Sequence, residues 1–263
     1  MTYPITNPTY GTYPWFLLRV GVYLGQNPDT ATWGHEEYHL TDVLVQAGLM
    51  KFYYPPPVDM QITPHEWSFL RPTGEMTLAS GTRIYDLPDD FDRVDGSLVY
   101  MDDDYCPIQI TSEARIRALR HSSNAQSAPE FAAVRAMACE GTAPQRQEME
   151  FHPTPDSEYR LRYRYHAIPR ALTTARPYPL GGTAHAETIA AACLAEAELK
   201  KLNVRGDMHA AFMERIVASI AQDSRRGPDV WGYNGDPSTS RGRYDRRAWR
   251  DWVTSDITYN GDT

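Results

Sequence analysis

The most regular pattern in the chain is an alternation of apolar and basic positions between Tyr159 and His166. Tyrosine or leucine takes every second position, with arginine or histidine between them: Tyr159, Arg160, Leu161, Arg162, Tyr163, Arg164, Tyr165 and His166. Successive side chains of a strand leave opposite faces of a sheet, so the alternation predicts a strand with one buried face. Met149 and Phe151 precede it across the turn-forming run 152–157. We therefore predict an antiparallel hairpin at the centre of a β region.

Two segments with helical character precede this β region. Pro14 suits the first turn of a helix that we expect to extend through Leu24. A second helix is expected from near Thr32 to near Phe52, where a proline run ends it. Spacing of i, i+3, i+4 and i+7 predicts one apolar face on this helix: Leu40, Val43, Leu44 and Ala47. The opposite, polar stripe is expected to be solvated: His35, His39, Asp42 and Gln46.

Two more helices are expected after the β region. Residues 183–202 are rich in alanine, and alanine at this density lets another helix approach closely. A turn follows at 203–206, and apolar residues then recur at every fourth position up to Arg225: Met208, Phe212, Ile216 and Ile220. The pattern predicts an αα-hairpin, which could complete a four-helix bundle with the two N-terminal helices.

Short β-prone pieces cut by Pro, Gly and Asp occupy residues 60–169 and predict an antiparallel sheet or sandwich. One short helix is expected among them, from its cap Ser112 to His121. The expected fold class is therefore α+β: a helical bundle with an inserted antiparallel β region and an extended C-terminal arm. The expected boundaries are 1–58 for an N-terminal arm and two helices, 59–180 for the β region, 181–226 for the αα-hairpin and 227–263 for the arm.

The composition indicates a folded protein, with 41% hydrophobic and 23% charged residues in 263. A net charge of −8 argues against a surface built to hold nucleic acid nonspecifically. Of the 26 basic residues, 23 are arginine, which suits planar pairing at protein interfaces, although a GC-rich genome explains the count equally well. Three widely spaced cysteines suggest a reducing cytoplasm, and we expect neither a membrane span nor a signal peptide.

The segment from Gly227 onward has no periodicity and is rich in Trp, Tyr and Arg, the residues enriched in interface hot spots. Between Arg225 and Arg250, seven arginines accompany three aspartates, a local charge of +4 in an acidic chain. We predict an arm that orders against a partner. Its expected binding residues are Trp231, Tyr233, Arg241, Arg243, Tyr244, Arg246, Arg247, Trp249, Arg250 and Trp252.

The segment His35-Glu36-Glu37-Tyr38-His39 matches the H-E-x-x-H motif of zinc proteases. That chemistry needs both imidazoles on one helical face, Glu36 as a base and a third ligand, for which only the distant Glu66 offers itself. The charged Glu37 inside the motif and the polar stripe around it are typical of a solvated helix face instead. We therefore expect no metal and no catalytic residue here.

Two other charged sets have structural interpretations. The aspartates of residues 89–104 lack the spacing and closing Glu of an EF-hand, and turn chemistry explains them at least as well. Arg160, Arg162 and Arg164 could contact phosphate. In an acidic protein we favour a solvent-facing sheet side, or pairing with acids of a neighbouring subunit, so these three residues form an expected inter-subunit β face.

The run Tyr85-Asp86-Leu87-Pro88-Asp89-Asp90-Phe91 after short strands resembles the head-to-tail adaptor proteins (connector, tail tubular protein A-like) of tailed bacteriophages. Two other parts of the chain share the resemblance: Phe151-x-Pro153 with Tyr159-x-Leu161-x-Tyr163, and the opening helices with Trp33, Gly48-Leu49 and Phe52-Tyr53-Tyr54-Pro55. In the order of its elements the resemblance spans residues 15–226.

The resemblance implies a structural virion protein of the neck or tail, assembled in the host cytoplasm, without catalysis, cofactor or membrane. Proteins of this family assemble, usually as twelve copies, into a ring beneath the portal. Their helices line or surround a channel for DNA that passes without sequence-specific binding, and C-terminal arms reach into the portal. The implied partners are further copies of the chain, the portal protein, a downstream tail or neck protein and the genomic DNA.

Two alternatives from other classes stay open on the sequence alone. One is a zinc-dependent hydrolase that uses His35, Glu36 and His39. The other is a β-rich binding module of a tail tip or fibre, whose aromatic strand face grips a saccharide. Metal content distinguishes the first, and copurification with portal subunits distinguishes the second.

Overall fold

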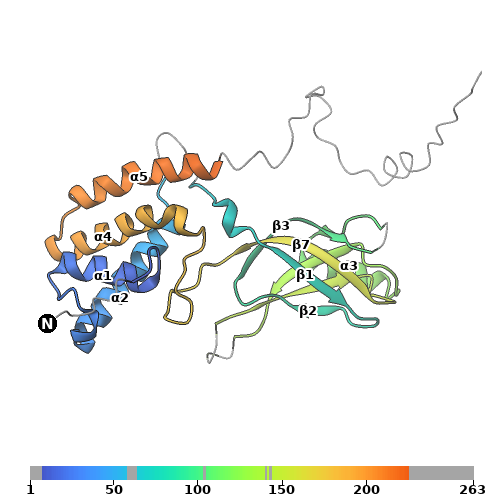
Figure 1. Cartoon of the computed structure of the whole chain (residues 1–263). Coiled ribbons are helices and arrows are strands. Elements are labelled where there is room, and N and C mark those ends of the chain that lie inside the picture. Colours follow the sequence, from blue (N-terminus) through green and yellow to red (C-terminus); the bar gives the residue numbers. More distant parts are fainter. Residues whose placement is uncertain (1–7, 58–63, 103–104, 140, 142–143, 225–263) are drawn as a thin grey trace, which may run out of the picture.

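The structure is a computed structural model that describes residues 8–57, 64–102, 105–139, 141 and 144–224. Helices gather at one end of the molecule and strands at the other (Figure 1). The helical region contains α1 (Tyr13–Leu24), α2 (His35–Tyr53), α4 (Ala186–Leu202) and α5 (Asp207–Ser224). A β-sandwich with the short α3 (Glu113–Ser122) forms the other end. The predicted α+β class is confirmed.

The central helix of the helical region is α4, which contacts α1, α2 and α5. Its alanines are buried: Ala186, Ala190, Ala191, Ala192, Ala195 and Ala197. These small side chains let the neighbouring helices approach closely. At the closest point, a Cβ on Gly48 of α2 would lie 2.4 Å from the Cα of Cys193. Large core side chains come mainly from the surrounding helices, among them Phe16, Phe52 and Phe212.

Local sequence signals explain where these helices begin and end. Pro14 stands in the first turn of α1, and Gly25 ends it with φ +94°. The Glu37 carboxylate accepts a hydrogen bond from Gly34 N at 2.9 Å and so caps the start of α2. The 3-10 turn Thr30–Thr32 precedes α2, which therefore begins three residues later than expected from the sequence. Ser112 caps α3 as predicted, accepting from Arg115 N.

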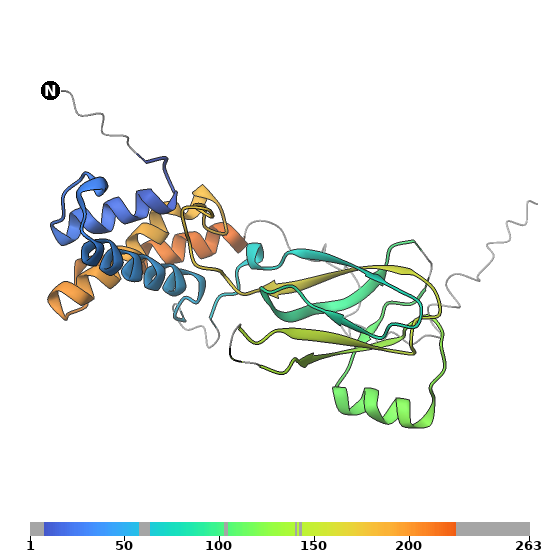
Figure 2. The same cartoon turned by 90° about the horizontal axis from the view of Figure 1, so that it is seen from below.

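Seven strands in the described part of the chain form two facing sheets. One sheet has the order β1-β7-β3 and the other β2-β6-β5-β4. Their bounds are β1 Thr73–Leu78, β2 Ile84–Asp86, β3 Phe91–Tyr100, β4 Gln109–Ile110, β5 Phe131–Ala136, β6 Gln147–His152 and β7 Tyr159–Ala167. All pairs are antiparallel except β4 with β5. The helix α3 packs on β5 and β6, on the outer side of the sandwich (Figure 2).

The alternation in β7 is confirmed, because its Tyr and Leu side chains are buried and its arginines are exposed. The predicted hairpin is wrong. Both edges of β6 are occupied by β2 and β5, and both edges of β7 by β1 and β3. The segment between them therefore carries the chain from one sheet to the facing sheet. Met149 and Phe151 meet Leu161 and Tyr163 in a shared core rather than along a ladder of hydrogen bonds.

The predicted apolar face of α2 is also wrong. Of its four residues only Leu44 is buried, whereas Leu40, Val43 and Ala47 are exposed. The face that packs on the rest of the region is instead Thr41, Leu44, Val45, Gly48, Leu49 and Phe52. Close approach to α4 at Gly48 decides the rotation of the helix, because a larger side chain at that position would collide with the α4 backbone.

The two regions meet at the segment that leads from α2 into β1. Trp67 is buried in the core of the helical region and donates from Nε1 to the carbonyl of Phe52 at 3.0 Å. Phe52, Phe69 and His185 surround its ring. A Trp body in an apolar cluster with its N–H satisfied is a stable anchor. The β-sandwich is thereby connected to the helical core just before its first strand.

Candidate interaction surfaces

A buried carboxylate fixes the end of α5 to the junction of the two regions. Asp223 accepts hydrogen bonds from the amide and the hydroxyl of Ser68 and lies 3.0 Å from Nε2 of His65. Burial alone would raise the pKa of Asp223, but the Ser68 hydrogen bonds and His65 outweigh it and hold the pKa below its usual range. The carboxylate is thus charged and satisfied at neutral pH. The chain leaves α5 from a fixed point one residue later, at Ser224.

The residues predicted to form the binding arm lie outside the described part of the chain. They are Trp231, Tyr233, Arg241, Arg243, Tyr244, Arg246, Arg247, Trp249, Arg250 and Trp252. Their role stays a prediction. Asp223, which the sequence analysis did not single out, fixes the end of α5, from which the chain continues toward this segment. The available signal was its spacing from Phe212, Ile216 and Ser219, which places it on the buried side of α5.

The three arginines of β7 project from the outer face of the three-stranded sheet, each about half exposed. Each lies near an acid of the same chain: Arg160 is 3.5 Å from Asp102, Arg162 is 2.9 Å from Glu75, and Arg164 is 3.9 Å from Asp95. Exposed pairs of this kind contribute little to stability and exchange partners easily. Their use by a neighbouring subunit stays a prediction.

The opposite face of β7 is closed to ligands. Tyr159, Leu161, Tyr163 and Tyr165 are all buried between the two sheets. Burial and the neighbouring Asp90 raise the pKa of Tyr165 to about 12, in keeping with a side chain removed from water. A saccharide-binding aromatic face on this strand is therefore wrong, because the aromatic rings form the core of the sandwich.

The H-E-x-x-H segment forms the exposed first turn of α2. The rings of His35 and His39 are stacked with centroids 6.4 Å apart. Glu66, the distant candidate ligand, is engaged by Arg71 and Arg93. Among the residues that the structure describes, no group of three or more His, Cys, Asp and Glu side chains is placed to share a metal ion. This part of the molecule supplies no third ligand for a hydrolytic zinc.

Arginines accompany the aspartates that the sequence groups between residues 89 and 102. Asp89 lies 2.8 Å from Arg146, and Asp95 lies 3.9 Å from both Arg71 and Arg164. Asp90 accepts a hydrogen bond from the hydroxyl of Tyr165. These contacts fit the structural interpretation of the acidic residues better than a calcium site, where the carboxylates would converge on one ion.

The described residues thus form a helical region joined to a β-sandwich, with charged side chains exposed on the outer face of the sandwich. The family model of the SU10 adaptor protein matches residues 12–241. The chain therefore belongs to this family, and the resemblance to phage head-to-tail adaptors is confirmed. No curated protein matches the sequence.

Family membership makes the chain a structural adaptor of a bacteriophage and a component of the virion that contacts other capsid or tail proteins. Among its described helices, none combines the length and the apolar character needed to cross a lipid bilayer.

Proposed function

We propose that this chain is a head-to-tail adaptor that assembles as a ring, with twelve copies as the expected number, between the portal and the tail. The ring belongs to the neck of the particle and contributes to the channel through which DNA is ejected. The C-terminal segment 227–263 is its portal-binding arm. A different surface of the ring contacts a downstream tail or neck protein. The match to the adaptor family over residues 12–241 supports the assignment.

The proposed role of the arm rests mainly on one observation, which is that the end of α5 is fixed in place. Asp223 joins α5 to Ser68 and His65 at the place where the helical region meets the β-sandwich. A segment that begins at such a point starts from the same position in every copy, which favours docking into repeated clefts of a ring-shaped partner. Its Trp, Tyr and Arg residues are of the kind that dominate binding energy when they are buried in a partner.

The charge of the chain supports a channel role. A net charge of −8 repels the DNA backbone, so DNA can slide past the ring rather than adhere to it. Only three lysines are present, and much of the basic charge is carried by arginines that pair with acids of the same chain. Sequence-specific readout of bases is not part of the proposal.

Deletion of Arg241–Thr263 tests the proposal. The two cores lie within residues 8–224, so the shortened chain is expected to fold, with an unchanged circular dichroism spectrum. It should lose binding to purified heads that carry the portal, measured by cosedimentation. Trp249→Ala/Trp252→Ala should weaken binding strongly, whereas the matched pair Thr254→Ala/Thr258→Ala should not. Undiminished binding of the deleted chain would contradict the portal-binding role.

A further inference from the structure

Two segments of chain cross side by side between the helical region and the sandwich (Figures 1 and 2). We call residues 64–72 the first connection and residues 168–172 the second connection. The first leads into β1 where the second leaves β7, and the amide of Tyr165 donates to the carbonyl of Pro72 at 3.2 Å. Among the described elements, no extensive contact joins α1, α2, α4 or α5 directly to a strand. The orientation of one region relative to the other therefore depends on this joint of two connections.

The first connection is held to the helical region at several points. Trp67 and Leu70 are buried in the helical core. His65 and Ser68 contact the carboxylate of Asp223 at the end of α5. Only a short stretch, part of it a 3-10 turn, separates Leu70 from the start of β1. The first connection therefore has little free length between the helical core and the sheet.

The second connection is fixed at both of its ends. Leu172 is buried in the helical core, and its backbone pairs with the side-chain amide of Gln46 in α2. The Gln46 amide donates to the carbonyl of Leu172 at 2.8 Å and accepts from its N–H at 3.1 Å. At the other end, the N–H of Ile168 donates to the carbonyl of Asp90, just before β3, at 2.6 Å. The second connection is thus attached to a helix and to the sandwich by hydrogen bonds of its backbone.

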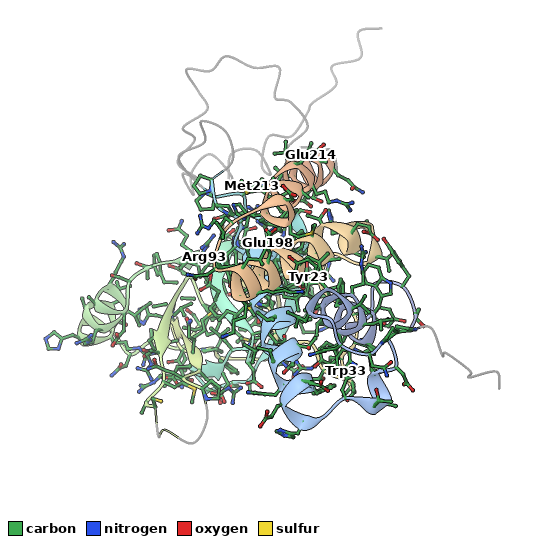
Figure 3. All side chains as sticks on the ribbon, turned by 90° about the vertical axis from the view of Figure 1, so that its left-hand side faces the viewer. Tyr23, Trp33, Arg93, Glu198, Met213 and Glu214 are labelled. Atoms are coloured by element: carbon green, nitrogen blue, oxygen red, sulfur yellow. The ribbon has the colours of Figure 1, made fainter. Side chains whose placement is uncertain are left out.

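Glu66 adds a side-chain contact from the first connection to the sandwich. Its carboxylate accepts from Arg93 of β3 at 2.5 Å and from Arg71 at 3.0 Å, and lies 4.0 Å from Nε2 of His166 in β7. Seen from the helical end, Arg93 lies behind the helices and near the middle of the molecule (Figure 3). Arg93 and His166 are opposite each other in the ladder and so share the outer face of the three-stranded sheet. Burial alone would raise the pKa of Glu66, but its basic partners outweigh burial and hold the pKa below its usual range.

The position of Glu66 gives it a mechanical role that the backbone cannot fill. Two chain connections alone would leave the sandwich free to bend about the line that joins them. The contacts of Glu66 are made on the outer face of the sheet, away from that line, and therefore oppose bending. Glu66 is also only two residues from Ser68, which binds Asp223. One short turn thus connects the sandwich to the end of α5, where the chain leaves the helical region.

We propose that Glu66 is a positioning residue, which holds the sandwich at one orientation relative to the helical region and the end of α5, and that high salt releases it. The inference concerns the single chain and goes beyond the proposed function. The Glu66 side chain is 50% exposed, so salt screens its attraction to the arginines. The buried Trp67 and the backbone hydrogen bonds of Leu172 carry no charge, so the released joint bends without coming apart.

Distances between two spin labels on the full-length chain test the proposal. The exposed Cys106 and Cys139 are first replaced by serine, and the buried Cys193 is kept. Val43→Cys in α2 and Val99→Cys in β3, both 49% exposed, then carry the labels. Electron paramagnetic resonance measures the distribution of label distances at about 0.15 M and about 1 M salt. An exposed ion pair shifts an equilibrium by about two- to fivefold, so the share of bent molecules should rise by that factor at high salt and widen the distribution.

Substitutions at Glu66 should remove the dependence on salt. Glu66→Ala is expected to give the wide distribution at both salt concentrations, because no carboxylate is left to be screened. Glu66→Gln keeps an acceptor for the arginines without the charge and should give an intermediate width that salt hardly changes. Glu75→Ala is the matched control, because Glu75 is similarly exposed and pairs with Arg162 on the same face, but that pair joins two strands of the sandwich. It should behave as the native chain does.

A second label pair distinguishes bending at the joint from loosening within the helical region. Val43→Cys and Val217→Cys place both labels on helices of that region, and their distribution should stay narrow in Glu66→Ala. Equal widths of the native chain and Glu66→Ala for the labels at positions 43 and 99 would overturn the inference. Broadening for the labels at 43 and 217 as well would also overturn it. Because the measurement uses the free chain, neither result bears on the adaptor role, which binding to the portal tests separately.

Discussion

The helical region and the β-sandwich bury their cores in opposite ways. The helical region is organised around small side chains on α4, where backbones approach closely at Gly48 and Cys193. The sandwich is filled by large side chains from both sheets, including Phe151, Tyr163 and Tyr165. Substitutions that add side-chain volume should therefore destabilise the helical region, and substitutions that remove volume should destabilise the sandwich. The outer surfaces differ in degree as well: among the described residues, most ion pairs lie on the sandwich, whereas more of the exposed large apolar side chains lie on the helices.

The largest loss of stability is expected from Phe151→Ala in the sandwich. Phe151 is fully buried, and its ring lies edge-on to Tyr85 at 5.7 Å between centroids. Truncation of a buried Phe leaves a cavity and costs about 3–5 kcal/mol in the free energy of unfolding. Urea denaturation measures the change. The exposed Val99→Ala is the control in the same region and should change stability by less than about 0.5 kcal/mol. Similar losses in both variants would mean that the sandwich core is not where its stability resides.

The next largest effect is expected at the joint between the regions, from Asp223→Ala. The change removes a buried acceptor from Ser68 and His65 and should cost about 2–3 kcal/mol in the free energy of unfolding. An acid at a helix C-terminus is unfavourable by about 0.3–1 kcal/mol, which offsets only part of that loss. Denaturation of the variant beside the exposed neighbour Gln222→Ala measures the difference. Equal stability of the two variants would show that Asp223 does not hold the joint.

The same carboxylate gives the joint a defined pH dependence. Because the pKa of Asp223 is lowered in the folded protein, its contribution to stability is complete at neutral pH. That contribution is lost as pH falls below about 4 and through the lowered pKa. The stability difference between the native chain and Asp223→Ala should therefore shrink over this range. A difference that stays constant down to pH 2 would indicate that the carboxylate is not the stabilising group.

The complementary change in the helical region is Gly48→Ala. In an exposed helix this substitution stabilises by about 1 kcal/mol through helix propensity. Here the new Cβ would lie 2.4 Å from the Cα and 2.6 Å from the N of Cys193, so α2 and α4 must move apart. Overpacking costs about 1–3 kcal/mol, which cancels or exceeds the propensity gain, so a net loss of up to about 2 kcal/mol is expected. The exposed neighbour Ala47→Gly should lose about 1 kcal/mol for the opposite reason, loss of propensity. A stabilised Gly48→Ala variant would refute close approach at this point.

Sequence patterns anticipated the features that depend on neighbouring residues. The helix beginning at Pro14, the cap at Ser112 and the alternation in β7 follow from backbone chemistry over a few positions, and the structure shows all three. The hairpin failed because a turn of Pro, Asp and Ser allows the chain either to return beside the previous strand or to cross to a facing sheet. Only the partners of β6 and β7 decide between these outcomes.

The prediction of which face of α2 is buried was wrong for a similar reason. Leu40, Val43 and Ala47 have the helical spacing of a core stripe, and so do Val45, Leu49 and Phe52 on the other side. The number of apolar residues alone does not decide which of these two faces is buried. The close contact between Gly48 and the backbone of Cys193 in α4, nearly 150 positions away in the sequence, decides which face of α2 is buried. The joint at Asp223 was missed because Ser68 and His65 are equally distant along the chain.

The smallest effect is expected from Arg162→Ala on the outer face of the sandwich. Arg162 pairs with Glu75 at 2.9 Å, but both side chains are 54% exposed. Water and salt screen such a pair, so its removal should change the free energy of unfolding by no more than about 1 kcal/mol, and by less in 1 M salt. Denaturation at low and high salt, with Glu75→Ala and the double variant completing a thermodynamic cycle, isolates the pair from the loss of each side chain alone. A coupling energy well above 1 kcal/mol would mean that this face is a structural part of the sandwich. A small coupling energy leaves Arg162 free to exchange Glu75 for an acid of a neighbouring subunit, as the prediction of an inter-subunit β face requires.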